Sequence, residues 1–110
     1  MTRAPAAEQP VATHTPALVA LSGMDVQERR QLIADAQTAI ENTRTSHDRT
    51  IRIDCAHVHV VDLVLVGTLT VIARNAQRCG RRVELIEPPS WLRRNIAATR
   101  TRPLLTWNTH

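Results

Sequence analysis

The chain has 110 residues, which fits a single domain with one modest core. It contains neither Phe nor Tyr, so this core must be mainly aliphatic. The 14 basic residues are all Arg and exceed the 10 acidic residues, leaving a net charge of +4 that favours acidic partners without defining a fold. The longest apolar stretch, residues 58–73, is interrupted by polar residues and is shorter than the ~20 apolar residues of a membrane-spanning helix, so we expect no such helix.

The first 16 residues are rich in Ala, Pro and Thr and lack the hydrophobic stretch of a signal peptide. We therefore expect a disordered tail over residues 1–16 and one domain over residues 17–110. The two cysteines, Cys55 and Cys79, do not form the pattern of a disulfide framework. A reduced, cytoplasmic setting is the resulting expectation.

The first elements of the domain are a strand and a helix. Residues 17–21 form a short apolar run that ends at Ser22-Gly23, which is typical of a strand followed by a turn. The segment 25–43 then carries apolar residues at a spacing of three to four, which predicts an amphipathic helix. Asp25 and Glu28 have the spacing of a capping box at its start.

The rest of the domain alternates between strands and helices. Residues 50–55 and 81–87 alternate between apolar and polar side chains, which predicts strands with one covered and one wetter face. Helical spacing of apolar residues over 64–79 places a helix between them, as in a crossover that joins parallel strands. Another helix is expected within residues 88–99. The fold class is α/β, with helices mainly on one face of a small sheet.

One acid and three aliphatic residues mark the start of the helix over 64–79. Asp62 can accept hydrogen bonds from the free backbone N–H groups there, which is a sufficient structural reason for its presence. The next residues, Leu63, Val64 and Leu65, span about 200° around a helix, so they cannot all point inward. We predict that Leu63 or Val64 is exposed and able to contact a partner, although packing into the core is the alternative.

The order of these segments resembles the STAS domain of bacterial anti-sigma factor antagonists. The resemblance rests on "IRIDCAHVHVVDLVLVGTL" followed by "RCGRRVELIEPPSWLRRNI". In that family a strand ends in Asp, and a second Asp opens the pattern D-S-S-G-L-G at the start of a helix. Asp54 and Asp62 match the two acids, Gly67 matches the second glycine, and Asp25 falls near a recurrent acid. The resemblance implies a small mixed β-sheet with helices mainly on one face.

The resemblance also implies a regulated protein contact, and this chain departs from it. In antagonists of the family, an ATPase-fold anti-sigma kinase phosphorylates the first Ser of the pattern and thereby ends binding. Leu63 occupies that position here, so no phosphate can be attached to it. Thr68 and Thr70 are the nearest hydroxyls, and both are weak candidates because they lie within the helix.

The function we predict is therefore that of a non-catalytic protein-interaction module in bacterial transcription regulation. Its partner would be an ATPase-fold anti-sigma kinase or a related ATPase subunit, and self-association to a homodimer is a further alternative. An accessory subunit of a lipid-transport ATPase is an alternative function within the same family. The predicted partner-binding residues are Asp25, Asp62, Leu63, Val64, Leu65 and Gly67.

Other chemistries receive little support from the sequence. Cys55, His57 and His59 are of zinc-binding types, but a fourth ligand with suitable spacing is missing. Phosphate-cradling glycine loops and a catalytic triad are also missing, so we expect neither a cofactor nor enzyme activity.

A nucleic-acid-binding domain is the alternative from another functional class. It depends on Trp91 and on a cluster formed by Arg81, Arg82, Arg93, Arg94, Arg100 and Arg102. Solvated faces explain most runs of charge, and two tryptophans are too few for a stacking platform. The same arginines could instead meet an acidic protein surface.

Overall fold

The computed structural model describes residues 17–45, 47–98 and 104–108. The predicted tail over residues 1–16 lies outside the described residues. The elements in chain order are β1 Leu18–Val19, α2 Val26–Asn42, a 3-10 turn Thr43–Thr45, β2 Thr50–Asp54, α3 Leu63–Arg78, β3 Arg82–Ile86, α4 Ser90–Ala98 and β4 Leu105–Asn108. The predicted order of strands and helices is confirmed. The strand β4 was not among the predicted strands, and it completes the sheet.

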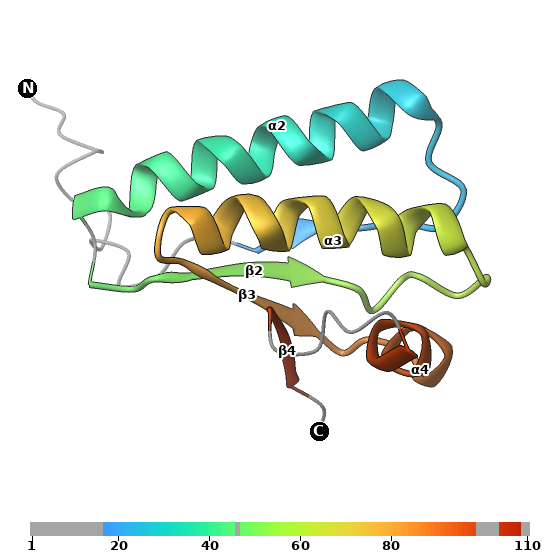
Figure 1. The fold of residues 1–110 in the computed structure, drawn as a ribbon. Coiled ribbons are helices and arrows are strands. Elements are labelled where there is room, and N and C mark those ends of the chain that lie inside the picture. The colour runs from blue at the N-terminus through green and yellow to red at the C-terminus, as the bar shows by residue number, and fades with distance from the viewer. Residues whose placement is uncertain (1–16, 46, 99–103, 109–110) are drawn as a thin grey trace, which may run out of the picture.

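The four strands form one sheet in the order β1-β2-β3-β4. All three strand pairs are parallel, so the described part of the chain contains no antiparallel pair of the kind that a mixed sheet includes. Helices α2 and α3 lie side by side over one face of the sheet, and α4 lies beyond the end of β3 (Figure 1). The expected α/β architecture, with helices mainly on one face, is confirmed.

The core lies between this sheet face and the helices. The alternation of β2 and β3 places Ile51, Ile53, Val83 and Leu85 inward, and all four are fully buried. The helix residues that pack on them from α3 are Leu65, Leu69, Ile72 and Ala76, which follow the spacing expected from the sequence. Cys79, the last residue of the predicted helix over 64–79, is exposed, and α3 ends at the preceding residue.

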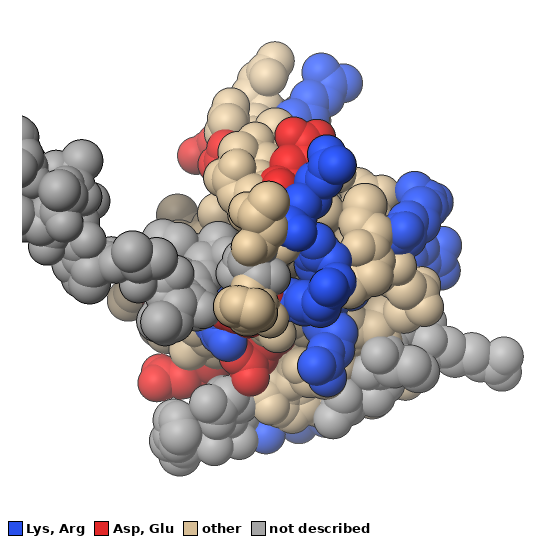
Figure 2. Space-filling view, turned by 90° about the vertical axis from the view of Figure 1, so that its left-hand side faces the viewer, with Lys and Arg blue, Asp and Glu red and all other residues tan. Residues whose placement is uncertain are grey.

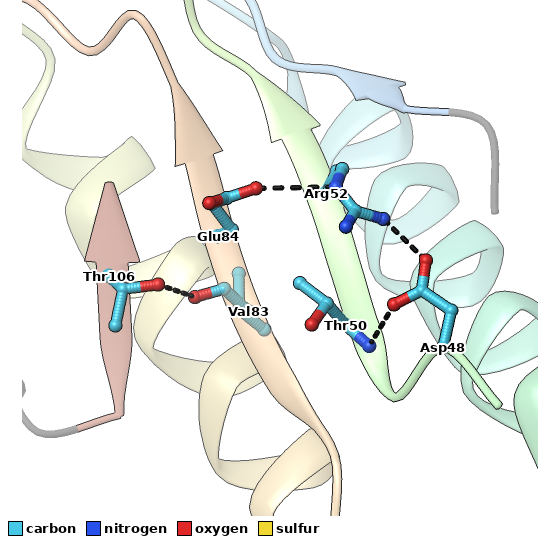
Figure 3. Close-up of polar contacts among 6 residues, drawn as sticks. All are labelled: Asp48, Thr50, Arg52, Val83, Glu84 and Thr106. Carbon is cyan, nitrogen blue, oxygen red and sulfur yellow. Dashed lines mark hydrogen bonds and ion pairs between the residues drawn. The ribbon is translucent and has the colours of Figure 1, made fainter. Parts of the chain in front are cut away.

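The opposite face of the sheet carries polar side chains. Arg52 of β2 donates to Asp48 at 2.6 Å and contacts Glu84 of β3 at 3.2 Å (Figure 3). The hydrogen bond to Asp48 is the main cause that raises the pKa of Arg52 above its ordinary value. Asp48 also accepts a hydrogen bond from the backbone of Thr50. This face is therefore the wetter one, as the alternation predicted.

Candidate functional site

Asp62 caps the start of α3. One oxygen of its carboxylate accepts hydrogen bonds from the backbone N–H groups of Val64 at 3.1 Å and Leu65 at 3.2 Å. These N–H groups have no partner within the helix, and the carboxylate also faces the positive end of the helix dipole. The predicted capping role of Asp62 is confirmed.

The second oxygen of Asp62 joins two loops that are far apart in the sequence. It accepts a hydrogen bond from the backbone of Gly23 at 2.9 Å. Beside it, the hydroxyl of Ser22 donates to the carbonyl of Val60 at 2.6 Å and accepts from the Val60 N–H at 3.3 Å. Gly23 has a φ of +76°, a conformation that favours glycine. The turn after β1 is thus held against the loop that leads into α3.

Ser22 and Gly23 were not predicted as members of the site. The sequence marked them only as the end of the first strand. No local sequence pattern could have placed them there, because they reach the site through the pairing of β1 and β2 as adjacent parallel strands whose carboxyl ends lie at the same edge of the sheet. Loops that follow such strands meet in space.

Asp25 lies two residues beyond this junction and caps α2. Its carboxylate accepts from the N–H of Glu28 at 2.8 Å, and the Glu28 carboxylate accepts from the N–H of Asp25 at 2.9 Å. The predicted capping box is confirmed. Asp25 is exposed, so it borders the site while its carboxylate is engaged in the cap.

The start of α3 presents aliphatic side chains to solvent. Leu63 is 62% exposed and Val64 is 55% exposed, which confirms the expectation that at least one of them points outward. Val60 and Val61, in the loop just before the helix, are also exposed. We call these four residues the apolar ledge.

Leu65 does not belong to this exposed surface. It is 0% exposed and packs in the core, so its predicted place among the contact residues is corrected. The reason is helical geometry: Leu65 and Leu69 are four residues apart and share the inward face of α3. Gly67 lies on the outer face and is exposed.

A shallow pocket adjoins the apolar ledge. It has a volume of about 340 Å³ and lies between the turn after β1 and the loop before α3. Its lining residues are Ser22, Gly23, Met24, Val60, Val61 and Asp62. The site therefore combines an aliphatic surface with one carboxylate whose oxygens are already hydrogen-bonded to the backbone.

The two hydroxyls considered for modification are both engaged within α3. Thr68 is buried and donates to the carbonyl of Val64 at 3.1 Å. Thr70 is half-buried and donates to the carbonyl of Val66 at 2.9 Å. Neither hydroxyl is presented to a kinase in this arrangement.

The residues of zinc-binding type do not come together. Cys55 is fully buried, whereas His57 and His59 are exposed and lie 6.1 Å apart between ring centroids. Among the described residues, no group of three or more His, Cys, Asp or Glu side chains is placed to hold a metal ion. No helix in the described part of the chain is both long and apolar enough to cross a membrane.

Comparison with protein families agrees with this geometry. A family model described as "Mlab, STAS domain" matches residues 9–106, which is most of the chain. The chain belongs to the STAS domain family. Searches of curated proteins and of solved structures found no match. In this STAS domain the site described above lies at the start of α3, where β1 and β2 also end.

We expect replacement of Asp62 by Ala to destabilise the STAS domain by about 2 kcal/mol, because it removes the cap of α3 and the bond to Gly23. Urea unfolding measures this change. Asp35→Ala is the matched control: among the described residues, Asp35 accepts only a side-chain hydrogen bond, from Gln31 on the surface of α2, and its loss should change stability by less than about 0.5 kcal/mol. Equal effects of the two variants would contradict the role assigned to Asp62.

Gly67→Ala is expected to stabilise the domain by about 0.5–1 kcal/mol, because glycine is a poor helix former and an added Cβ meets nothing within 4 Å. Gly80→Ala serves as the control, since Gly80 has a φ of +71° and alanine there should cost about 1–2 kcal/mol. Thermal unfolding compares the two. If Gly67→Ala also weakens partner binding, the partner contacts the backbone at this position and a methyl group there interferes.

Proposed function

We propose that this STAS domain is a non-catalytic protein-interaction module that docks through the apolar ledge at the start of α3. The observation that carries the proposal is the exposure of Leu63 and Val64 beside a buried Leu65. Exposed aliphatic side chains that cluster on one surface are typical of a protein contact. Asp62 holds the helix start, and Asp25 borders the contact.

The ledge can contribute substantial binding energy. Fully burying one Val or Leu side chain is favourable by about 1.5–3 kcal/mol, and the members of the ledge are more than half exposed. The loops that carry it are held by the Ser22–Val60 and Gly23–Asp62 hydrogen bonds. A surface that is already ordered loses little conformational entropy on binding, which favours affinity.

We propose an ATPase-fold anti-sigma kinase as the partner, in the bacterial cytoplasm and in transcription regulation. The usual serine switch is lacking, because Leu63 has no hydroxyl and the hydroxyls of Thr68 and Thr70 bond to backbone carbonyls. The module would therefore bind without being switched off by its own phosphorylation. Any regulation would then reside in the partner.

An accessory subunit of a lipid-transport ATPase is the second candidate. The same observation favours it, because a permanent subunit needs no phosphorylation switch at Leu63. The apolar ledge would serve as the contact in either case, so the two candidates differ in the partner and not in the surface.

The nucleic-acid alternative is weakened by the positions of its residues. Arg81 is buried, and Trp91 is half-buried and donates its indole N–H to the carbonyl of Val58 at 3.3 Å. Arg93 and Arg94 lie on α4, at the opposite end of β3 from Arg82. Arg100 and Arg102 lie outside the described residues. The described members of this cluster therefore do not share one surface with an aromatic ring available for stacking.

Affinity capture from the native host tests the proposal. The wild-type domain and the Leu63→Asp variant are immobilised in parallel, and the bound proteins are identified. A kinase-like ATPase retained only by the wild type supports the anti-sigma pathway, and a transporter ATPase retained only by the wild type supports the second candidate. Recovery of only a second copy of this chain, or only of nucleic acid, would overturn both.

A further inference from the structure

Several arginines gather at the end of the molecule opposite the apolar ledge. They come from the 3-10 turn after α2, the loop before β2, the end of α3 and the start of β3, and we call them the arginine stripe: Arg44, Arg49, Arg78, Arg81 and Arg82. Figure 2 shows a narrow column of basic side chains over this end, with acidic residues along one side. The sequence alone had grouped Arg81 and Arg82 with the arginines of α4 instead.

Backbone and side-chain contacts bring the stripe together. The N–H of Arg82 donates to the carbonyl of Arg49 at 3.0 Å. The guanidinium of Arg81 donates to the hydroxyl of Thr43 at 2.6 Å and to the Thr43 carbonyl at 3.1 Å. Arg44 and Arg81 also line one hollow of about 450 Å³ together with Cys79. Residues from four separate segments therefore form one surface.

Arg81 is the one member of the stripe with a structural role in the described part of the chain. Arg81 is buried and satisfies carbonyl groups near the ends of both helices, those of Thr43 and Cys79. The other four are exposed, and none makes an ion pair with another described residue, although Arg78 donates a hydrogen bond to the side chain of Asn75 at 3.1 Å. Exposed charges that no described acidic residue pairs with are available to a ligand.

Nearby negative charge does not neutralise the stripe. Glu41 lines the same hollow as Arg44, and Asp48 is engaged with Arg52 on the open face of the sheet. The two helix ends add only about half a negative charge each. Positive charge remains in excess at this end of the molecule.

The shape and composition of the stripe indicate its ligand. The exposed large hydrophobic residues of the described chain all lie elsewhere, so this surface offers nothing for insertion into a lipid bilayer. Among the described residues, neither the stripe nor the hollow includes a tryptophan, and the chain has no Phe or Tyr, so a large aromatic ring on which a nucleic-acid base could stack is lacking there. Arginine binds both carboxylates and phosphates in a forked geometry, and on a surface without an apolar patch or a tryptophan a narrow row of guanidinium groups is best matched by a row of carboxylates.

We propose that the arginine stripe binds an extended acidic peptide segment rich in Asp and Glu. The site is separate from the docking surface, because α3 has 16 residues and spans about 24 Å between the two ends. One STAS domain could then hold its main partner at the apolar ledge and an acidic segment, of that partner or of another protein, at the arginine stripe. This inference does not depend on the proposed function.

Binding of a fluorescent decaglutamate peptide tests the inference. At low salt the domain is expected to bind it, and about 0.5 M salt should abolish binding because exposed charges are then screened. Arg44→Gln or Arg82→Gln should each weaken binding about twofold to fivefold, and the double variant about tenfold. The matched controls Arg30→Gln and Arg94→Gln remove the same charge from exposed positions outside the stripe and should have little effect.

A second readout locates the peptide. Cys79 lies in the hollow beside Arg44 and Arg81, so bound decaglutamate should slow its reaction with a thiol reagent. Failure to bind decaglutamate, or equal losses in stripe and control variants, would overturn the inference. Tighter binding of an oligothymidylate or of phosphatidylglycerol vesicles, lost in the same stripe variants, would also overturn it. Leu63→Asp should leave decaglutamate binding intact, which separates this test from that of the proposed function.

Discussion

Leu63→Asp is expected to weaken binding of the captured partner by about 30-fold or more while the domain stays folded, because an aliphatic side chain at the centre of the apolar ledge is replaced by a charge. The side chain is 62% exposed, so the folded state gains no buried charge. Leu63→Ser should have a smaller effect in the same direction. Circular dichroism reports the fold, and titration with the captured partner reports the affinity.

The neighbouring leucine provides the matched control. Leu65 is fully buried two residues away, so Leu65→Ala should cost about 2–5 kcal/mol of stability. Leu63→Ala should cost far less, since most of its surface is already in water. If Leu63→Asp unfolds the protein, the residue belongs to the core and the docking proposal fails. If the variant stays folded and binds normally, the contact lies elsewhere.

The domain is expected to lose stability between pH 9 and pH 12 because of Cys55. Burial, with a smaller contribution from the charge of Asp54, raises the pKa of this thiol from 9.0 to about 12. Below pH 9 the thiol is protonated in both the folded and the unfolded chain. Above it the unfolded chain ionises first, so the free energy of unfolding falls by up to about 4 kcal/mol as pH approaches 12, given about 1.36 kcal/mol per pKa unit.

Urea unfolding across this pH range measures the effect. The chain contains neither Lys nor Tyr, so the two cysteines are the side chains with ordinary pKa values in this range. Cys55→Ala should flatten the alkaline decline, although it lowers stability at neutral pH by leaving a small cavity. Cys79→Ser should leave the decline unchanged, because Cys79 is exposed. If the stability of Cys55→Ala still falls equally between pH 9 and pH 12, Cys55 is not the cause of the alkaline loss of stability.

Structural features that depend on residues close together in the sequence were predicted well. Alternation placed Ile51, Ile53, Val83 and Leu85 on the covered face, and helical spacing placed the inward residues of α3. The capping roles of Asp25 and Asp62 were also predicted, because a cap is made by a side chain and backbone groups only two or three residues away. The exposure of Leu63 and Val64 followed from the arc that three consecutive helical residues cover.

Errors arose where a residue's environment depends on its distant partners. Leu65 was assigned to the contact surface, yet packing against the sheet buries it. The predicted helix over 64–79 included Cys79, but α3 ends at Arg78 and Cys79 is exposed. Arg81 appeared to be part of an exposed cluster, but the carbonyl groups of Thr43 and Cys79 hold it in a buried position.

By itself, the amino-acid sequence determined the first three strands, the helices, their inward faces and the caps, since each depends on contacts within a few residues. Only the tertiary structure decided that Ser22 and Gly23 bond to Val60 and Asp62, 38 and 39 residues away. It also decided which arginines share one end of the molecule. The physical reason is that parallel strands bring distant loops to a common edge of the sheet, and no local periodicity encodes which side chains meet there.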